Sequence, residues 1–179
     1  MTAAGMRHTL ILGGARSGKS ALAERLADDC GLAVTYVATA QAGDGEMAAR
    51  IVHHRARRPP HWACIEEPLA LVEVLREHAA AERCLLVDCL TLWLSNLLAD
   101  PDPRRQQREC EALSALLPSL PGRVLLVGNE VGLGVVPMGE LSRRFVDEAG
   151  RLHQALAARC DQVLFVAAGL PMALKGTCP

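Results

Sequence analysis

One eight-residue motif constrains this chain more than any other feature. Residues 13–20 read Gly-Gly-Ala-Arg-Ser-Gly-Lys-Ser and match G-x-x-x-x-G-K-[ST] in full. A β-rich run at residues 8–12 precedes the motif and a helical pattern follows it, which is the context in which these residues form a phosphate-binding loop. A structural glycine turn is the alternative. One of only two lysines in the chain, Lys19, stands where a phosphate loop needs it.

The residue types of the motif suit a polyphosphate. Glycines permit positive φ, so that consecutive N–H groups can converge on phosphate oxygens, and the following helix directs its partially positive N-terminus at the same anion. Lys19 supplies a mobile charge for the outer phosphates, and Ser20 offers a hydroxyl to Mg²⁺. The apolar run at residues 84–88 ends in Asp88, which we expect to be the carboxylate partner of that Mg²⁺. Capping of the next helix is the alternative role for Asp88.

Short β-rich runs alternate with longer helical patterns along the whole chain. The expected strands are residues 8–12, 33–38, 62–66, 84–88, 123–129 and 162–168. The expected helices are residues 20–29, 46–57, 69–81, 90–99, 104–117 and 140–159. Such alternation favours a parallel sheet covered by helices. We therefore predict an α/β fold of the three-layer P-loop NTPase type, with a mostly parallel sheet flanked by helices.

Length and composition exclude several classes of protein. We expect 179 residues to form one catalytic domain, residues 1–179. A net charge of −1 and an aromatic content of 3% argue against binding of nucleic acid. No apolar segment reaches membrane-spanning length. The seven cysteines are scattered, which is typical of buried free thiols in a reducing compartment. A cytoplasmic protein is expected.

Residues 46–58 form the second informative segment. On a helix, Arg50, His54 and Arg57 lie on one face at spacings i, i+4 and i+7. Guanidinium groups bind phosphate oxygens with paired hydrogen bonds, and they lower the pKa of a neighbouring imidazole. A neutral imidazole at His54 can act as a nucleophile or a base. A solvated helix end before Pro59 is an equally good interpretation of these residues alone.

Two further features come from the second half of the chain. The helix at residues 140–159 places five apolar side chains on one face at helical spacing, and we expect them to pack in the core: Leu141, Phe145, Ala149, Leu152 and Leu156. Glu130 follows the expected fifth strand. It is a candidate base for an acceptor hydroxyl, and a structural role in a turn is equally plausible.

Taken together, these segments resemble the bifunctional adenosylcobinamide kinase / adenosylcobinamide-phosphate guanylyltransferase family of cobalamin biosynthesis. The resemblance covers about residues 7–175. It is carried by residues 13–20, 36–40 (Tyr-Val-Ala-Thr-Ala), 46–51 with His54, Arg58-Pro59, Trp62, 87–98, 129–137, and Gly169-Leu170-Pro171 with Lys175.

The resemblance implies two reactions on one scaffold. ATP or GTP phosphorylates the aminopropanol hydroxyl of adenosylcobinamide. GTP then donates GMP to a histidine, and adenosylcobinamide phosphate takes that GMP to give adenosylcobinamide-GDP and pyrophosphate. The partners that the resemblance implies are a corrinoid substrate, the nucleotides and further copies of the same chain, most commonly as a homotrimer, in addition to the Mg²⁺ expected from the phosphate loop and Asp88.

The resemblance also assigns residues. The guanylylated histidine falls on His54, and we expect Lys19 to be the second catalytic residue. Ser20 and Asp88 are expected at Mg²⁺. The expected nucleotide contacts are Gly13, Gly14, Ala15, Arg16, Ser17, Gly18, Lys19, Ser20, Ala38, Thr39, Ala40, Arg55, Ala56, Arg57, Arg58, Glu66 and Asp88.

The chain departs from the family pattern at two positions. Met138 stands where the family usually carries glutamate, and Ala168 stands where it usually carries serine. Neither position belongs to the phosphate loop or to His54. Two alternative functions are a P-loop small-molecule kinase that lacks the transferase activity, and a P-loop nucleotide-binding switch or ATPase module.

Overall fold

The computed structural model describes residues 6–40 and 59–179, which build a sheet of seven strands with the order β3-β2-β4-β5-β1-β6-β7. All neighbouring strands are parallel except β6 and β7, which are antiparallel. The strands are β1 (His8–Gly13), β2 (Ala33–Ala38), β3 (Ala63–Glu66), β4 (Arg83–Asp88), β5 (Arg123–Asn129), β6 (Gln162–Ala167) and β7 (Leu170–Lys175).

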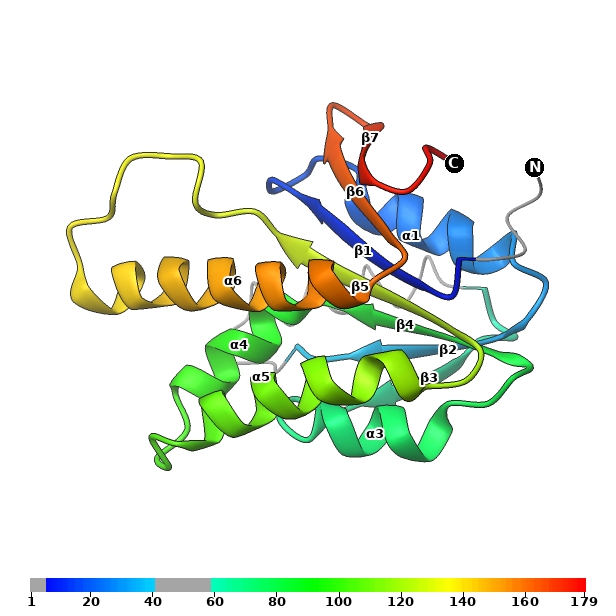
Figure 1. Cartoon of the computed structure of the whole chain (residues 1–179), viewed down its shortest axis with the longest axis horizontal. Helices are drawn as coiled ribbons and strands as arrows, with labels where there is room; N and C mark the ends of the chain where they lie inside the picture. The colour runs from blue at the N-terminus through cyan, green and yellow to red at the C-terminus, as the bar shows by residue number, and fades with distance from the viewer. Residues whose placement is uncertain (1–5, 41–58) are drawn as a thin grey trace.

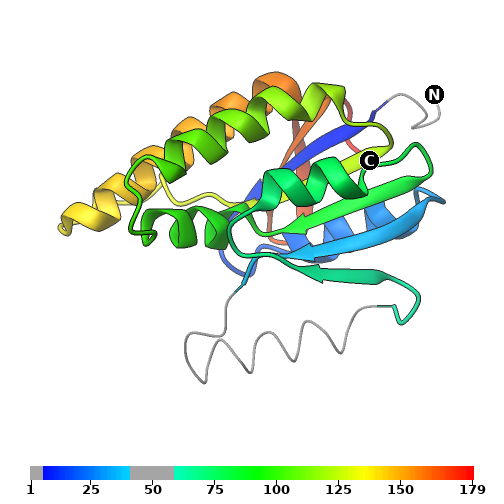
Figure 2. The same cartoon turned by 90° about the horizontal axis from the view of Figure 1, so that it is seen from below.

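Helices cover both faces of this sheet (Figures 1 and 2). On one face lies α1 (Lys19–Asp28), which packs into one apolar cluster with side chains from the sheet. On the opposite face, a second cluster joins α3 (Leu71–His78), α4 (Leu90–Leu98), α5 (Arg105–Leu116) and α6 (Glu140–Arg159). The three-layer α/β fold predicted from the sequence is confirmed.

The internal strands are buried because helices lie over both of their faces. All six residues of β1 are buried, and so are the four central residues of β4. Strands in such a sheet need apolar side chains at every position rather than at alternate ones. This explains why continuous apolar runs marked them in the sequence.

The structure places most elements within two residues of their predicted bounds. β2, β5 and α6 match the prediction at both ends. The expected helix at residues 46–57 lies outside the described residues. β7 was missed, because its sequence is short and contains Pro171. Ala168 belongs to the turn before β7 and not to β6, and its φ of 52° is followed by a φ of 79° at Gly169. Two positive φ angles are typical of a tight two-residue hairpin.

The apolar stripe on α6 is only partly a core feature. Leu152 and Leu156 are buried, as predicted. Leu141, however, is 66% exposed and Phe145 is half-buried. The reason is that α6 is 20 residues long and its first turns extend beyond the sheet (Figure 1). The prediction of core packing is therefore wrong for Leu141.

The cysteines are not uniformly buried. Cys84, Cys89 and Cys160 are buried, whereas Cys64 and Cys178 are exposed, in contrast to the prediction for these two. Among the helices of residues 6–40 and 59–179, none has the length and the apolar character needed to cross a bilayer.

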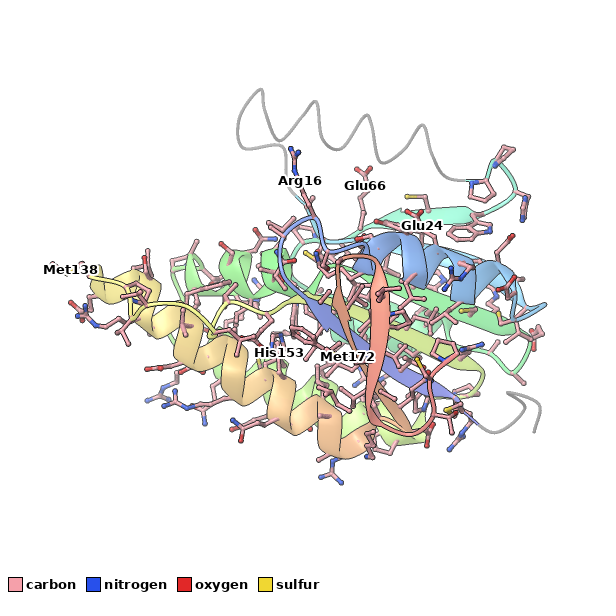
Figure 3. The ribbon with its side chains drawn as sticks, turned by 90° about the horizontal axis from the view of Figure 1, so that it is seen from above. Arg16, Glu24, Glu66, Met138, His153 and Met172 are labelled. Atoms are coloured by element: carbon pink, nitrogen blue, oxygen red, sulfur yellow. The ribbon has the colours of Figure 1, made fainter. Side chains whose placement is uncertain are left out.

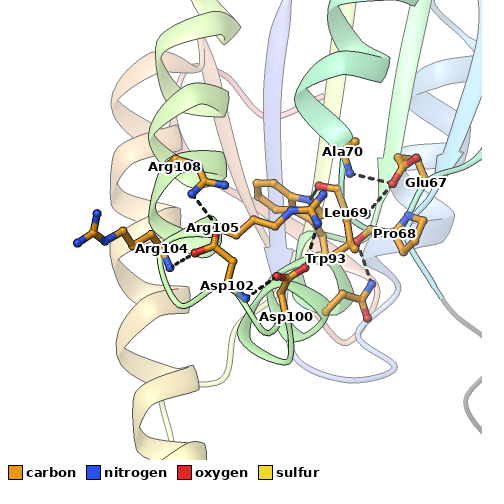
Figure 4. A network of polar contacts seen from close by, with 11 residues as sticks. Glu67, Pro68, Leu69, Ala70, Trp93, Asp100, Asp102, Arg104, Arg105 and Arg108 are labelled. Atoms are coloured by element: carbon orange, nitrogen blue, oxygen red, sulfur yellow. Dashed lines mark hydrogen bonds and ion pairs between the residues drawn. The ribbon is translucent and has the colours of Figure 1, made fainter.

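A polar network fixes the segment after β3 to α4 (Figure 4). The indole N–H of Trp93 donates to the carbonyl of Leu69 at 2.9 Å. Glu67 Oε1 accepts the N–H groups of Leu69 and Ala70, both at 2.8 Å. At the other end of α4, Arg105 and Asp100 form an ion pair at 2.9 Å. These bonds hold α4, and with it the carboxyl end of β4, in place.

Candidate nucleotide-binding site

The phosphate loop connects the end of β1 to the start of α1. Within it, the N–H of Ser17 donates to the carbonyl of Gly14 at 3.3 Å. Arg16 has a φ of 56° and Gly18 a φ of 96°. These left-handed residues turn the chain tightly before α1, and glycine is the residue type that adopts this conformation without steric cost.

The loop rests against the turn between β6 and β7. The N–H of Gly169 donates to the carbonyl of Ser17 at 2.8 Å. A Cβ atom at Gly13 would lie 2.5 Å from the carbonyl oxygen of Val166, and one at Gly18 would lie 3.1 Å from the Cα of Gly169. The glycines of the motif are therefore needed for this packing as well as for backbone conformation.

The polar groups of the loop are arranged to receive an anion. α1 has no side-chain cap at its N-terminus and no acidic residue in its first turn, so its first N–H groups remain available to a ligand. The Oγ atom of Ser17 is buried without a hydrogen-bond partner. Lys19 is 9% exposed, and its Nζ donates to the carbonyl of Gly14 at 3.4 Å. Together these groups form a positively polarised cradle.

Asp88 lies at the carboxyl end of β4, and β5 separates this strand from β1. The hydroxyl of Tyr36 donates to Asp88 Oδ2 at 3.0 Å. The N-cap residue of α4 is Cys89 and makes no side-chain cap bond, which argues against a capping role for Asp88. Burial raises the pKa of Cys89 to about 11, and the positive charge of Lys19 opposes this shift. Because β1 and β4 are parallel strands of one sheet, the phosphate loop and Asp88 lie at the same edge of that sheet.

Thr39 joins the ends of β2 and β4. Its Oγ1 donates to the carbonyl of Cys89 at 2.7 Å and accepts the N–H of Cys89 at 3.0 Å. The side chain of Asn96 donates to the carbonyl of Thr39 at 2.9 Å. Thr39 is fully buried. Both hydrogen bonds of its hydroxyl are therefore made within the protein. The other two predicted contacts of this segment, Ala38 and Ala40, are its neighbours along the chain.

The remaining predicted contacts fall at one edge of the molecule or outside the described residues. Arg16 and Glu66 are exposed, and both point outward on the same side of the molecule (Figure 3). Glu66 ends β3. His54 and the residues predicted with it, Arg55, Ala56, Arg57 and Arg58, lie outside the described residues.

Glu130 borders the phosphate loop from β5. Its N–H donates to the carbonyl of Gly13 at 3.0 Å, and its Oε1 accepts the N–H of Gly132 at 2.6 Å. Its Oε2 lies 3.8 Å from Nδ1 of His153, which belongs to α6. Burial lowers the pKa of His153, and the Glu130 carboxylate opposes this shift. This pair could not be predicted from the sequence, because its members are distant along the chain.

A phosphate loop at the end of an internal parallel strand defines a P-loop nucleotide-binding protein. Two solved structures share this fold. The crystal structure of the RadB recombinase is 16% identical, covers 89% of this chain and 73% of its own, and has a TM-score of 0.52. The assembled ATPase EscN from enteropathogenic E. coli is 13% identical, with 91% and 43% covered and a TM-score of 0.53.

The sequence comparisons identify the family. Residues 9–174 match the family described as cobinamide kinase / cobinamide phosphate guanyltransferase. The bifunctional adenosylcobalamin biosynthesis protein CobP of Pseudomonas aeruginosa is 70% identical over 167 residues, which are 93% of this chain and 96% of that protein. The corresponding protein CobU of Escherichia coli K12 is 42% identical over 179 residues, with 93% and 98% covered.

The chain belongs to the cobinamide kinase / cobinamide phosphate guanyltransferase family. It is a bifunctional transferase that acts in cobalamin biosynthesis, as the sequence analysis predicted. This assignment favours the bifunctional enzyme over a kinase without transferase activity and over a nucleotide-dependent switch or ATPase module.

Proposed function

We propose that both reactions of this enzyme use the phosphate loop, with adenosylcobinamide and its phosphate as acceptors. The observation that carries the proposal is the cradle around Lys19. The uncapped start of α1 and the unpartnered Ser17 hydroxyl offer donors to the phosphates of ATP or GTP. Each reaction displaces a phosphate group of the nucleotide, so both need the same stabilisation of negative charge.

In the kinase step, the aminopropanol hydroxyl of adenosylcobinamide attacks the γ-phosphorus of ATP or GTP. The O–P bond to the acceptor forms as the bond to the nucleoside diphosphate breaks. Positioning and charge neutralisation suffice for this transfer. Lys19 would neutralise the outer phosphates. Glu130 is the candidate base that takes the hydroxyl proton. Its backbone N–H donates a hydrogen bond to the carbonyl of Gly13.

The residues around the loop fit Mg²⁺. Ser20 and Asp88 supply oxygen ligands, and Asp88 keeps one carboxylate oxygen besides the Oδ2 bonded to Tyr36. In the part of the chain that the structure describes, no group of three or more His, Cys, Asp or Glu residues gathers as a metal site. Mg²⁺ in nucleotide sites is commonly held by one or two protein oxygens, by phosphates and by water. When bound, it would neutralise charge that develops on the phosphates.

In the transferase step, we assign His54 as the nucleophile. A neutral imidazole nitrogen attacks the α-phosphorus of GTP, the N–P bond forms, and pyrophosphate leaves. A phosphate oxygen of adenosylcobinamide phosphate then attacks the same phosphorus, the N–P bond breaks, and adenosylcobinamide-GDP forms. Because GMP is transferred first to the histidine and then to the acceptor, one nucleotide site can serve a bulky acceptor without binding both substrates at the same time. The support is the resemblance of the segment around His54 to the family.

The other proposed nucleotide contacts are those predicted from the sequence: the phosphate loop, residues 38–40 and 55–58, Glu66 and Asp88. For Thr39 the contact would come from the backbone, because its hydroxyl is bonded to Cys89. We further propose that the chain is one catalytic domain, that it works in the cytoplasm, and that it assembles as a homotrimer.

Intact-mass measurement after exposure to GTP tests the covalent step. We expect the mass of the protein to increase by one GMP residue, with a linkage that is labile to acid and stable to base, as a phosphoramidate is. The adduct should be absent in His54→Ala and present in the matched control His53→Ala. His54→Ala should retain much of the kinase activity.

Two results would contradict this assignment. An adduct of equal yield in His54→Ala would place the GMP on another residue. An equal loss of both activities in His54→Ala, with His53→Ala unaffected, would mean that His54 has a general binding role instead of a covalent one.

A further inference from the structure

His153 is a buried polar residue on the face of α6 that packs against the sheet. It is 8% exposed, and it lies between the helix and the strands (Figure 3). Burial of an imidazole is unfavourable unless its ring nitrogens find polar partners, because water is removed from them. The groups around His153 therefore indicate what its side chain does.

Gly128 of β5 makes room for the imidazole. A Cβ atom at this position would lie 3.1 Å from Nε2 of His153 and 3.2 Å from Cδ2 of Leu12. Glycine within a strand commonly marks the close approach of another group, and any larger residue here would press on the ring. The imidazole is therefore held directly against β5.

Glu130 directs its carboxylate to the same face of the sheet. Side chains alternate between the two faces of a strand, and Leu126 of β5 packs in the apolar cluster to which α6 contributes. Gly128 and Glu130 follow on that face at intervals of two residues. The N–H of Glu130 donates to the carbonyl of Gly13 at 3.0 Å, so the carboxylate is placed next to the phosphate loop.

The two oxygens of this carboxylate have different partners. Oε1 of Glu130 accepts the N–H of Gly132, two residues away, at 2.6 Å. Oε2 lies 3.8 Å from Nδ1 of His153, which belongs to a separate element. This separation is longer than a hydrogen bond, but contacts in catalytic sites commonly tighten when substrate binds. Each carboxylate oxygen has two acceptor sites, so Oε2 can contact His153 and a substrate hydroxyl together.

We infer that His153 is a positioning residue for the kinase step, in which its Nδ1–H orients Oε2 of Glu130 toward the acceptor hydroxyl. The hydroxyl proton passes to the carboxylate as the hydroxyl oxygen bonds to the γ-phosphorus and the bond to the nucleoside diphosphate breaks. The imidazole keeps its own proton. The inference rests on the proposed role of Glu130 as the base, and it adds the residue that orients this base.

The charge of the imidazole suits this role. Burial lowers the pKa of His153, and the Glu130 carboxylate opposes this shift, so the ring is neutral at pH 7. A neutral donor orients the carboxylate and leaves it basic. An imidazolium would pair with the carboxylate and lower its pKa, which would make it a weaker base.

Glu130 is the charged group that acts on the imidazole. Among the elements that pack against α6, α4 carries no charged side chain. The thiol of Cys110 on α5 is neutral at pH 7, because burial raises its pKa to about 11. On α6 itself, Glu148 and Arg151 form an ion pair with each other. His8 of β1 lies at the opposite end of that strand from the phosphate loop.

Single-turnover formation of adenosylcobinamide phosphate, with ATP or GTP at saturation, tests the inference. Glu130→Gln should lower the rate by roughly 10²–10⁴-fold, as removal of a general base does. His153→Leu should lower it by about 10–100-fold, because the base is present but misplaced, and should change the half-saturating concentration of either substrate little. His153→Asn keeps an N–H donor near Oε2 and should recover most of the rate.

His78→Leu is the matched control and should keep the wild-type rate. Its helix, α3, begins after β3 and ends before β4, so His78 lies at the opposite edge of the sheet from the phosphate loop. Circular dichroism checks the folding of each variant. His153→Met, which also lacks an N–H donor, replaces the leucine variant if that protein fails to fold.

The pH profile separates positioning from packing. The wild-type rate should fall below about pH 6.5, as His153 gains a proton and pairs with the carboxylate. Asparagine does not titrate, so His153→Asn should show a flatter profile between pH 5 and pH 8. Parallel profiles for the two proteins would mean that the imidazole has only a structural role, and would overturn the inference.

Three rate measurements would also overturn it. A wild-type rate in His153→Leu, with a slow Glu130→Gln enzyme, would leave Glu130 as a base that needs no positioning residue. A His153→Asn enzyme as slow as His153→Leu would mean that the donor does not matter. A wild-type rate in Glu130→Gln would instead remove the proposed base itself from the kinase step.

Discussion

The two lysines of the chain have different surroundings, and this difference separates a chemical role from a structural one. Lys19 is 9% exposed beside the carbonyl of Gly14 in the phosphate loop. Lys175 is exposed and donates to the carbonyls of Ala157 and Ala158 at the end of α6. The side chain of Lys19 is the one positioned to neutralise a phosphate.

Lys19→Ala is therefore expected to depress both the kinase and the transferase reaction. Loss of a preorganised charge at a reacting phosphate costs roughly 10²–10³-fold in rate. Steady-state kinetics of each half-reaction would measure the effect. Lys175→Ala is the control and should leave both rates near the wild-type values. A Lys19→Ala enzyme that kept either rate would exclude the phosphate loop from that reaction.

His8 provides a residue-scale prediction about pH. It is buried at the start of β1, and neither ring nitrogen has a hydrogen-bond partner. Burial lowers its pKa below 6.5, with the carboxylate of Asp161 opposing the shift. The unfolded state therefore takes up a proton first as the pH falls, and the free energy of unfolding decreases below about pH 6.5, by at most about 1.4 kcal/mol per pH unit for one histidine.

Urea unfolding between pH 5 and pH 8 would show this dependence, and His8→Phe should make it shallower. Part of the slope should remain in this variant, because burial also lowers the pKa of His153. A His8→Phe protein with the wild-type slope would mean that His8 does not contribute to acid destabilisation.

At the scale of elements, buried hydrogen bonds join the strands that form the site. Substitution of Thr39 would measure how much these bonds contribute to stability. Thr39→Val removes the hydroxyl that bonds both backbone groups of Cys89 between the ends of β2 and β4. We expect the free energy of unfolding to fall by about 1–3 kcal/mol, because the N–H of Cys89 becomes buried without a partner. The carbonyl of Cys89 keeps the hydrogen bond from the N–H of Trp93 at 3.2 Å. Thermal or urea unfolding would measure it.

Thr39→Ser is the matched control for this prediction. Serine keeps both hydrogen bonds and loses one methyl group, which costs about 1 kcal/mol when the group is buried. Destabilisation by valine no larger than that by serine would mean that loss of the hydroxyl costs no more than loss of one methyl group, and would contradict the role of the hydroxyl.

The elements also show what could be predicted from the sequence. Strands such as β4 and β5 were predicted because burial on both faces demands unbroken apolar runs. The phosphate loop was predicted because its chemistry requires glycines and a lysine at fixed spacing. The exposure of Leu141 and the pairing of Glu130 with His153 were not predicted, since both depend on how α6 lies relative to the sheet. Periodicity along the helix carries no such information.

Nucleotide binding should stabilise the whole molecule, because the phosphate loop follows β1, which is an internal strand of the sheet. β1 is hydrogen-bonded to β5 on one side and to β6 on the other. A nucleotide bound at the phosphate loop therefore stabilises the complete sheet. A nucleotide at 100 times its dissociation constant should raise the free energy of unfolding by about 2.7 kcal/mol.

Urea unfolding with and without GTP and Mg²⁺ would measure this stabilisation. At the same nucleotide concentration, Lys19→Ala should show a smaller shift, because its dissociation constant is higher. An unchanged unfolding midpoint of the wild-type protein in saturating GTP would show that the loop is not the binding site.

The strand order also determines when the loop can be completed during synthesis of the protein. β1 is made before its two neighbours in the sheet, β5 and β6, which end at residues 129 and 167. A ribosome must therefore translate through residue 167 before the strand that leads into the loop has both of its partners. Until then the residues of β1 are exposed to solvent without their partner strands, which makes the nascent chain a natural substrate for chaperones.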